Sequence, residues 1–166
     1  MPRTRDSFMP ATRAIPGAAG WLALTFGAAW VGSRFLPGAW YEGLARPAWN
    51  PPNSIFAPVW TVLYLLMAVA AFRVWRRHGM AGARFPLTLF VLQLALNAAW
   101  SWLFFGLHRP DLAFVDIVVL WVAILATLIS FWKLDRFAGV LLIPYLVWVS
   151  FAAVLNWTIW RMNAMG

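Results

Sequence analysis

The sequence predicts an all-α integral membrane protein, a bundle of five transmembrane helices with little polypeptide outside the bilayer. Of its 166 residues, 63% are hydrophobic and only 11% are charged, whereas a soluble domain carries about 25% charged residues. Five apolar stretches each reach the roughly 20 residues that a helix needs to cross the hydrocarbon core. Each stretch is expected to be a helix and not a strand, because a lone spanning segment must satisfy its own backbone hydrogen bonds.

The boundaries of the spans follow the apolar runs. A tail over residues 1–16 comes first and is expected to be mobile. Its arginines followed by an apolar run are similar to a signal peptide, but the run is longer than a secretory h-region. The predicted spans cover about 17–36, 55–75, 85–107, 112–132 and 137–160. Three of the four links are short, which makes successive helices antiparallel neighbours.

The first link, over residues 37–54, is longer than the others and is rich in proline, which fixes φ and stiffens a loop. Aromatic residues in a link normally indicate that it folds back onto an apolar surface. We therefore interpret residues 37–54 as a lid, the lid loop. Its aromatic residues are Trp40, Tyr41 and Trp49.

Basic residues are distributed unequally between the two sides of the predicted bundle. Nine of the thirteen Lys and Arg fall on the side of the N-terminus and four on the other side. The positive-inside rule then predicts a cytoplasmic N-terminus, with the lid loop and the C-terminus on the opposite face of what we expect to be a bacterial cell membrane. The net charge of +8 does not favour a nucleic-acid partner, because the basic residues lie between apolar runs, where they suit lipid headgroups.

Polar and aromatic residues of several spans are expected to meet at one depth. Antiparallel threading places all of them in the half of the bilayer beneath the lid loop, and a buried polar group in a membrane is costly and therefore informative. The spacing within each span puts them on one face of the helix. The result is an aromatic-walled cavity with few amides, which is typical of a small-molecule site. The residues at this depth are Trp30, Trp60, Tyr64, Asn97, Trp100, Ser101, Asp116 and Asn156, and the same helix faces also carry Phe56, Gln93, Tyr145, Trp148 and Ala152.

Several of these residues have a second interpretation. Asn97 and Asn156 could serve as hydrogen-bonding glue between helices. Asp116 could act in the site or simply stabilise a helix dipole. His78 and His108 lie in links, and we expect solvated histidines and no metal site.

No catalytic motif of conventional type occurs, and the absence of cysteine removes thiolate chemistry and disulfides. Ala95 and Ala99 have the small-xxx-small spacing that permits close approach of helices. We expect a homodimer through this third span.

The order of motifs resembles the TspO/MBR family, the bacterial tryptophan-rich sensory proteins and the mitochondrial translocator protein, formerly the peripheral benzodiazepine receptor. The resemblance covers about residues 17–163, which we take as one transmembrane domain. The motifs are Trp40-Tyr41, Arg46-Pro47-Ala48-Trp49-Asn50-Pro51-Pro52, Phe56-Ala57-Pro58-Val59-Trp60-Thr61-Val62-Leu63-Tyr64, Gln93 to Ser101, and Pro144 to Asn156.

The resemblance implies a five-helix bundle, usually dimeric, with a pocket under the first loop. Such a pocket binds porphyrins, including protoporphyrin IX and haem, and benzodiazepine-like ligands, and no obligatory cofactor is implied. By motif position, Trp60 and Asn97 match polar contacts to the ligand, and Trp148 matches a tryptophan implicated in light-dependent porphyrin breakdown. The candidate ligand-binding residues are Tyr41, Trp49, Pro51, Trp60, Tyr64, Asn97, Trp100, Trp148, Ala152 and Leu155.

Three functions fit these expectations. The first is a receptor or sensor that holds a porphyrin by stacking on aromatic rings and regulates tetrapyrrole or stress responses. The second is a transporter of porphyrin or lipid. The sequence has no inverted repeat and no pair of broken helices, but Pro144 does interrupt the fifth span. The third is a light-dependent porphyrin-degrading enzyme that uses Trp148, since no general acid–base pair supports conventional catalysis.

Overall fold

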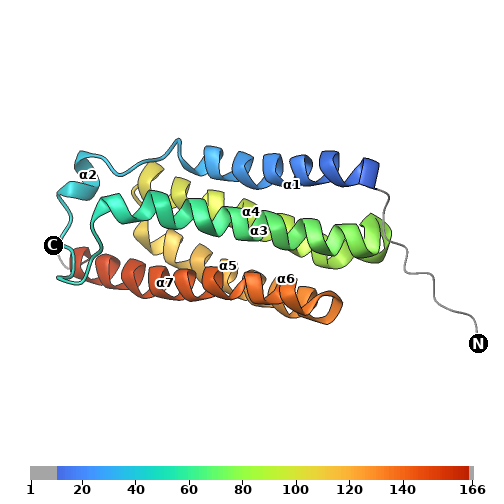
Figure 1. Ribbon diagram of the computed structural model, residues 1–166. Helices are drawn as coiled ribbons and strands as arrows, with labels where there is room; N and C mark the ends of the chain where they lie inside the picture. Colours follow the sequence, from blue (N-terminus) through green and yellow to red (C-terminus); the bar gives the residue numbers. More distant parts are fainter. Residues whose placement is uncertain (1–10, 165–166) are drawn as a thin grey trace, which may run out of the picture.

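The computed structural model describes residues 11–164, and the side chains of residues 14–164, as a bundle of long helices without strands (Figure 1). Five helical segments of this part are long and apolar enough to span a membrane, so the predicted fold class is confirmed. The start of α1 and the end of α7 lie at opposite ends of the bundle (Figure 1). The elements are α1 (Ala11–Gly32), α2 (Ala39–Glu42), α3 (Asn53–Gly82), α4 (Arg84–Ser101), the π-helix η1 (Trp102–Gly106), α5 (Pro110–Leu134), α6 (Arg136–Leu141) and α7 (Ile143–Asn163).

The helices differ from the predicted spans mainly at their ends. The first helix ends at Gly32, before the predicted end at Leu36, and it already includes residues 11–16 of the predicted tail. The rest of that tail, residues 1–10, lies outside the described residues. The fifth span consists of two helices, α6 and α7, that meet at Leu142. Pro144 in the first turn of α7 explains the break, because proline has no N–H to donate to the preceding turn.

The chain reverses between α3 and α4 at Gly79, where φ is 66° and ψ is 179°. Glycine populates this left-handed region readily because it has no Cβ. The reversal is tight, since α4 begins at Arg84 only five positions later. A predicted link at this glycine thus becomes a sharp turn within an almost continuous helical segment.

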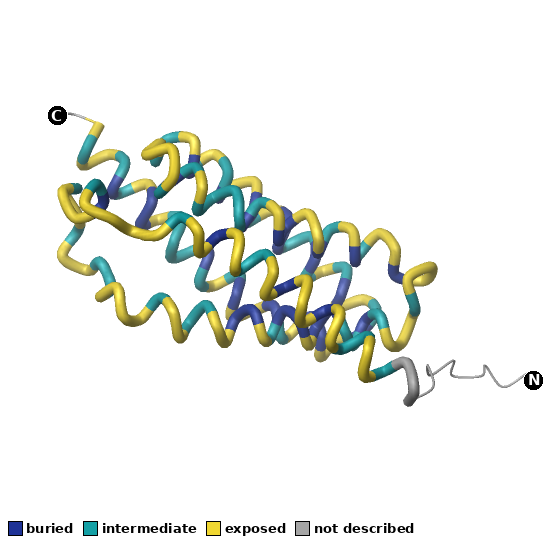
Figure 2. Tube along the Cα trace, turned by 90° about the horizontal axis from the view of Figure 1, so that it is seen from above, coloured by how far each residue is buried: buried dark blue, intermediate teal, exposed yellow. Residues whose placement is uncertain are grey.

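Packing in the bundle is uneven. The central helix α5 packs against α4 and α7, and α1 packs against α3 and α4. By contrast, α3 packs on α6 and makes few close backbone approaches to α7. Figure 2 shows buried positions along the inner sides of the helices and exposed positions outside. The exposed positions include large apolar residues, which suit lipid and not water; examples are Val62, Val115, Val122, Val147 and Val154.

An ion-pair cluster fastens the bundle at the end away from the lid loop. The side chain of Asp135 is only 2% exposed and lies 3.0 Å from Arg73 Nε and 3.1 Å from Arg77 Nη1. It also caps α6 by accepting hydrogen bonds from the backbone N–H groups of Phe137 and Ala138. Burial by itself raises the pKa of this carboxyl, but the Arg73 hydrogen bond and both guanidinium charges outweigh it, so the pKa lies below its usual value.

Candidate functional site

The lid loop crosses one end of the bundle, and the stretch that follows α2 passes the end of α7 (Figure 1). Trp40 stacks on His108 with ring centroids 4.3 Å apart and packs edge-on against Phe104. The positive φ of His108, 55°, accompanies this stacking in the link between η1 and α5. Tyr41 is only 4% exposed and packs edge-on against Phe104 and Phe105. The aromatic residues of α2 therefore close the end of the bundle.

Polar contacts hold the lid loop in this position. Asn163, near the end of α7, accepts a hydrogen bond from Ala45 N–H and donates one to the Ala45 carbonyl, both at 3.0 Å. Within the loop, the Tyr41 hydroxyl donates to Asn50 Oδ1 at 3.2 Å. The Arg46 guanidinium lies 5.1 Å from the centre of the Tyr41 ring, a cation–π contact. Opening the lid would break several of these contacts together.

Directly beneath α2 is an apolar cavity of about 40 Å³. Helices α3, α4 and α7, the π-helix η1 and the lid loop all contribute to its walls. The Trp100 indole N–H donates to Asn156 Oδ1 at 2.9 Å, and Asn156 Nδ2 donates to the Pro110 carbonyl at 2.8 Å. Asn156 thus ties three helices together at the cavity wall. The lining residues are Tyr41, Phe56, Trp100, Phe104, Phe105, Trp148, Phe151, Ala152, Leu155, Asn156 and Ile159.

The π-helix η1 supplies two consecutive residues to this cavity. Phe104 and Phe105 both line it, with ring centroids 4.9 Å apart in an edge-to-face arrangement. In a regular α-helix of 3.6 residues per turn, adjacent side chains point about 100° apart. A short π-helical stretch changes that spacing and is frequent at functional sites. The prediction of a continuous helix over residues 85–107 did not include this π-helix.

A second group of polar side chains lies deeper, away from the lid loop. The Tyr64 hydroxyl donates to Asn97 Oδ1 at 2.7 Å, and Asn97 Nδ2 donates to the Tyr145 hydroxyl at 3.0 Å. These bonds connect α3, α4 and α7. Trp60 packs against both tyrosine rings, at 5.4 and 6.2 Å between centroids. Asn97 is only 6% exposed and both ends of its amide bind protein, which supports the packing interpretation of this residue.

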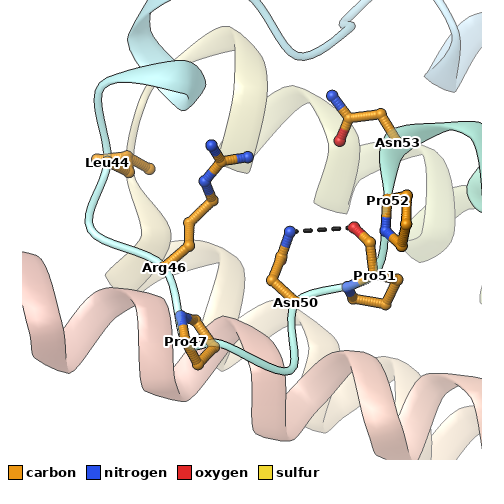
Figure 3. Close-up of a pocket in the computed structure, with 7 residues that line it drawn as sticks. All are labelled: Leu44, Arg46, Pro47, Asn50, Pro51, Pro52 and Asn53. Carbon is orange, nitrogen blue, oxygen red and sulfur yellow. Dashed lines mark hydrogen bonds between the residues drawn. The ribbon is translucent and has the colours of Figure 1, made fainter.

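Outside the lid loop, towards the water, is an open hollow of about 540 Å³ lined by the loop itself. Figure 3 shows Arg46, Asn50 and Asn53 around it. Asn50 Nδ2 donates to the Pro51 carbonyl at 3.1 Å, which fixes the loop near its proline pair. This hollow shares no lining residue with the apolar cavity. The lid loop separates the two spaces.

Comparison with known proteins assigns the chain. The TspO/MBR family model matches residues 19–161. The chain belongs to the TspO/MBR family. It is 40% identical to the tryptophan-rich protein TspO of Chlorobaculum tepidum over 149 residues, which cover 86% of this chain and 92% of that protein. It is 40% identical to the CrtK protein of Rhodobacter capsulatus over 80% of this chain and 83% of that protein. It is also 41% identical to the human translocator protein over 80% of this chain and 82% of that protein.

Family membership agrees with the resemblance stated from the motifs, and the structure shows where the motif residues lie in this TspO/MBR bundle. Half of the ten candidate ligand residues line the cavity, and half lie elsewhere. Trp49 is 48% exposed and packs edge-on against Phe151. Pro51 lines the outer hollow. Trp60, Tyr64 and Asn97 belong to the deeper polar group. The cavity-lining candidates are Tyr41, Trp100, Trp148, Ala152 and Leu155.

The sequence-based prediction missed other residues that line this cavity. Phe104, Phe105, Phe151 and Ile159 lie in apolar runs where nothing distinguishes a cavity wall from a lipid-facing side chain. Phe56 and Asn156 do fall on the predicted inward stripes, so the helical spacing was a usable signal for them. Both line the cavity.

Asp116 is the seventh residue of α5, beyond the first turn in which a carboxylate stabilises the helix dipole. The dipole interpretation therefore does not fit, and Asp116 Oδ2 is buried without a hydrogen-bond partner in the described part of the chain. Within that part, no group of three or more His, Cys, Asp or Glu side chains could hold a metal ion.

An apolar groove on the lipid-facing side adjoins the cavity of the TspO/MBR bundle. It has a volume of about 460 Å³ and lies between α3 and α7, two helices whose backbones make few close approaches. Trp148 and Phe151 line both the groove and the cavity. The groove residues are Pro58, Val59, Val62, Leu63, Pro144, Val147, Trp148 and Phe151.

Proposed function

We propose that this TspO/MBR protein is a membrane receptor that binds porphyrins, such as protoporphyrin IX and haem, and benzodiazepine-like ligands in the cavity beneath the lid loop. Its output would be regulation of tetrapyrrole or stress responses. One observation carries the proposal: seven of the eleven residues that line the cavity are aromatic. Flat aromatic ligands gain about 0.5–1.5 kcal/mol from each favourable ring contact beyond the burial of area.

The size of the cavity defines what binding requires. At about 40 Å³ it is far smaller than the roughly 300–1,000 Å³ of a typical ligand site. The walls must therefore separate when a porphyrin binds. Most of the wall consists of rings held by van der Waals contact, which separate without leaving a buried polar group unpaired.

Trp148 offers the ligand a hydrogen bond. Its indole N–H is buried and has no partner among the described residues. A buried donor without an acceptor is costly, and an acceptor on the ligand would remove that cost. The ring also packs edge-on against Phe56 and at a tilt against Phe151, so it lies between two further aromatic walls.

Filling the cavity tests the proposal. Ala152→Phe places a ring in the cavity and should weaken protoporphyrin IX binding at least tenfold, which is about 1.4 kcal/mol. Val154→Phe on the exposed side of the same helix is the matched control, because Val154 is 58% exposed. Quenching of tryptophan fluorescence in detergent micelles reports the dissociation constant, with a benzodiazepine and a sterol titrated alongside. Equal affinity of the Ala152→Phe protein and its parent would contradict the proposal.

Light-dependent porphyrin breakdown is the second candidate function, and the position of Trp148 in the cavity wall favours it. A photoexcited porphyrin held there would be in contact with the indole ring. Illumination of the purified protein with protoporphyrin IX, for the parent and for Trp148→Phe, tests this role. Breakdown at the same rate in both proteins would exclude Trp148 from the chemistry.

Transport of porphyrin or lipid is the third candidate. The break between α6 and α7 near Pro144 is its only support in the described part of the chain, and a pair of broken helices is the usual transporter feature. Porphyrin accumulation in sealed liposomes that contain the protein would support transport. No accumulation above protein-free liposomes would exclude it.

We further propose a homodimer through α4 and a cytoplasmic N-terminus. Ala95 is exposed and Ala99 half-buried on the surface of α4, which leaves the small-residue face accessible to a second copy. Ala95→Leu should shift the purified protein from dimer to monomer in light scattering. For topology, an impermeant thiol reagent should label Gly38→Cys, in the lid loop, from outside intact cells.

A further inference from the structure

We infer that hydrophobic ligands enter the cavity sideways from the bilayer, through the groove between α3 and α7, past a gate formed by the rings of Trp148 and Phe151. This inference rests on the proposed ligand-binding function and adds the route by which the ligand reaches the cavity. The ligand class is a flat apolar molecule that partitions into lipid and carries a hydrogen-bond acceptor.

The groove has both the volume and the apolar lining of a ligand site. The cavity behind it is too small to hold a ligand. The volume of the groove, about 460 Å³, is within the range of small-molecule sites. All eight lining residues are apolar or aromatic. Val62 on α3 and Val147 on α7 are 56% and 62% exposed, so the groove opens on the surface that faces lipid.

Two prolines shape this opening. Pro58 lies in the second turn of α3, and Pro144 lies in the first turn of α7, and both line the groove. A proline ring adds apolar bulk to a helix surface and carries no backbone N–H. This placement agrees with the few close approaches between the backbones of α3 and α7.

Two aromatic rings form a wall that the groove and the cavity share. Trp148 and Phe151 border both spaces, with ring centroids 5.6 Å apart. The Trp148 indole N–H has no hydrogen-bond partner in the described structure, so turning this ring breaks no hydrogen bond. Rotation of the two side chains would join a space of about 460 Å³ with one of about 40 Å³.

The alternative route through the lid loop requires more bonds to break. Asn163 holds Ala45 by two hydrogen bonds, Tyr41 binds Asn50, and Trp40 stacks on His108. In addition, the hollow outside the lid shares no lining residue with the cavity. The lateral gate is therefore the weaker barrier.

Blocking the groove without changing the cavity tests the route. The chain has no cysteine, so Val147→Cys supplies a single thiol that can be capped with a bulky apolar maleimide after folding. Protoporphyrin IX association and dissociation are measured by stopped-flow fluorescence in lipid nanodiscs, before and after capping. Val122→Cys on α5, 56% exposed and outside the groove, is the matched control.

Capping at position 147 should slow association and dissociation together by at least tenfold, with the dissociation constant nearly unchanged, and capping at position 122 should change neither rate. Equal rates before and after capping at position 147 would overturn the lateral route, and faster association after Asn163→Ala would then favour entry through the lid loop. If the uncapped proteins bind no protoporphyrin IX at all, the proposed receptor function fails. The two failures are therefore distinguishable.

Discussion

Replacing Asn97 with leucine should destabilise the bundle by breaking the deeper polar group. The substitution keeps the volume similar but removes both hydrogen bonds of the amide, at 2.7 Å to Tyr64 and at 3.0 Å to Tyr145. It leaves two buried hydroxyls without their partner. Since Tyr64 is 7% and Tyr145 1% exposed, neither hydroxyl has free access to water or headgroups.

The size of the effect follows from interhelical hydrogen bonds measured in membranes. Such bonds average about 0.6 kcal/mol and reach about 1.7 kcal/mol. Two bonds in one site then give a loss of about 1–3 kcal/mol in the free energy of unfolding. The triple variant Asn97→Leu, Tyr64→Phe, Tyr145→Phe removes all three polar groups. It should recover most of the lost free energy of unfolding, because no polar group is left unpaired.

The assay is titration of the detergent-solubilised protein with sodium dodecyl sulfate, followed by far-ultraviolet circular dichroism. The parent, the single variant and the triple variant are compared under identical lipid and detergent conditions. If Asn97→Leu is as stable as the parent, or if the triple variant is less stable than the single one, the packing role derived for Asn97 is wrong. Protoporphyrin IX affinity of the single variant should change little, because Asn97 does not line the cavity.

Further substitutions test other contacts. Asp135→Asn should cost about 1–3 kcal/mol, less than the loss of a fully buried pair, because Arg73 and Arg77 are partly exposed. The pKa of Asp135 is depressed in the folded protein. The stabilisation that its carboxylate provides is therefore present above the unfolded-state pKa of about 3.9 and is lost as the pH falls through the folded-state pKa. A pH series of denaturant titrations should show this loss of stability in the parent and not in Asp135→Asn. Gly79→Ala should cost about 1–3 kcal/mol, because φ 66° with ψ 179° is a backbone conformation that essentially only glycine adopts, and thermal unfolding in detergent measures it. Trp100→Phe should lower stability by about 0.6–1.7 kcal/mol through loss of the bond to Asn156, and an unchanged unfolding midpoint would contradict that role.

Much of the fold could be predicted from the sequence because the bilayer imposes simple rules. Each span is a run of apolar residues long enough to cross the membrane. The prolines and glycines mark the turns, as Gly79 and Pro144 illustrate. Antiparallel threading also predicted that Trp100 and Asn156, which are distant in sequence, lie at one depth, and both line the cavity.

The sequence did not distinguish a cavity wall from a packing contact at the same depth. Trp60, Tyr64 and Asn97 lie on predicted inward faces, yet they hydrogen-bond or stack among themselves and with Tyr145 instead of lining the cavity. Phe104 and Phe105 were missed because they lie in an apolar run, where no local residue pattern predicted the π-helix that carries both.

The sequence by itself determined that the chain is a membrane bundle of five apolar spans, because crossing lipid depends on the composition and length of each segment alone. Only the tertiary structure decided that the cavity is small, that α3 and α7 part to form a groove, and that Trp148 lies between the two spaces. These features depend on how side chains from different helices fill the space between them. Such packing depends on which residues of two helices meet, and the residue pattern of a single helix does not contain that information.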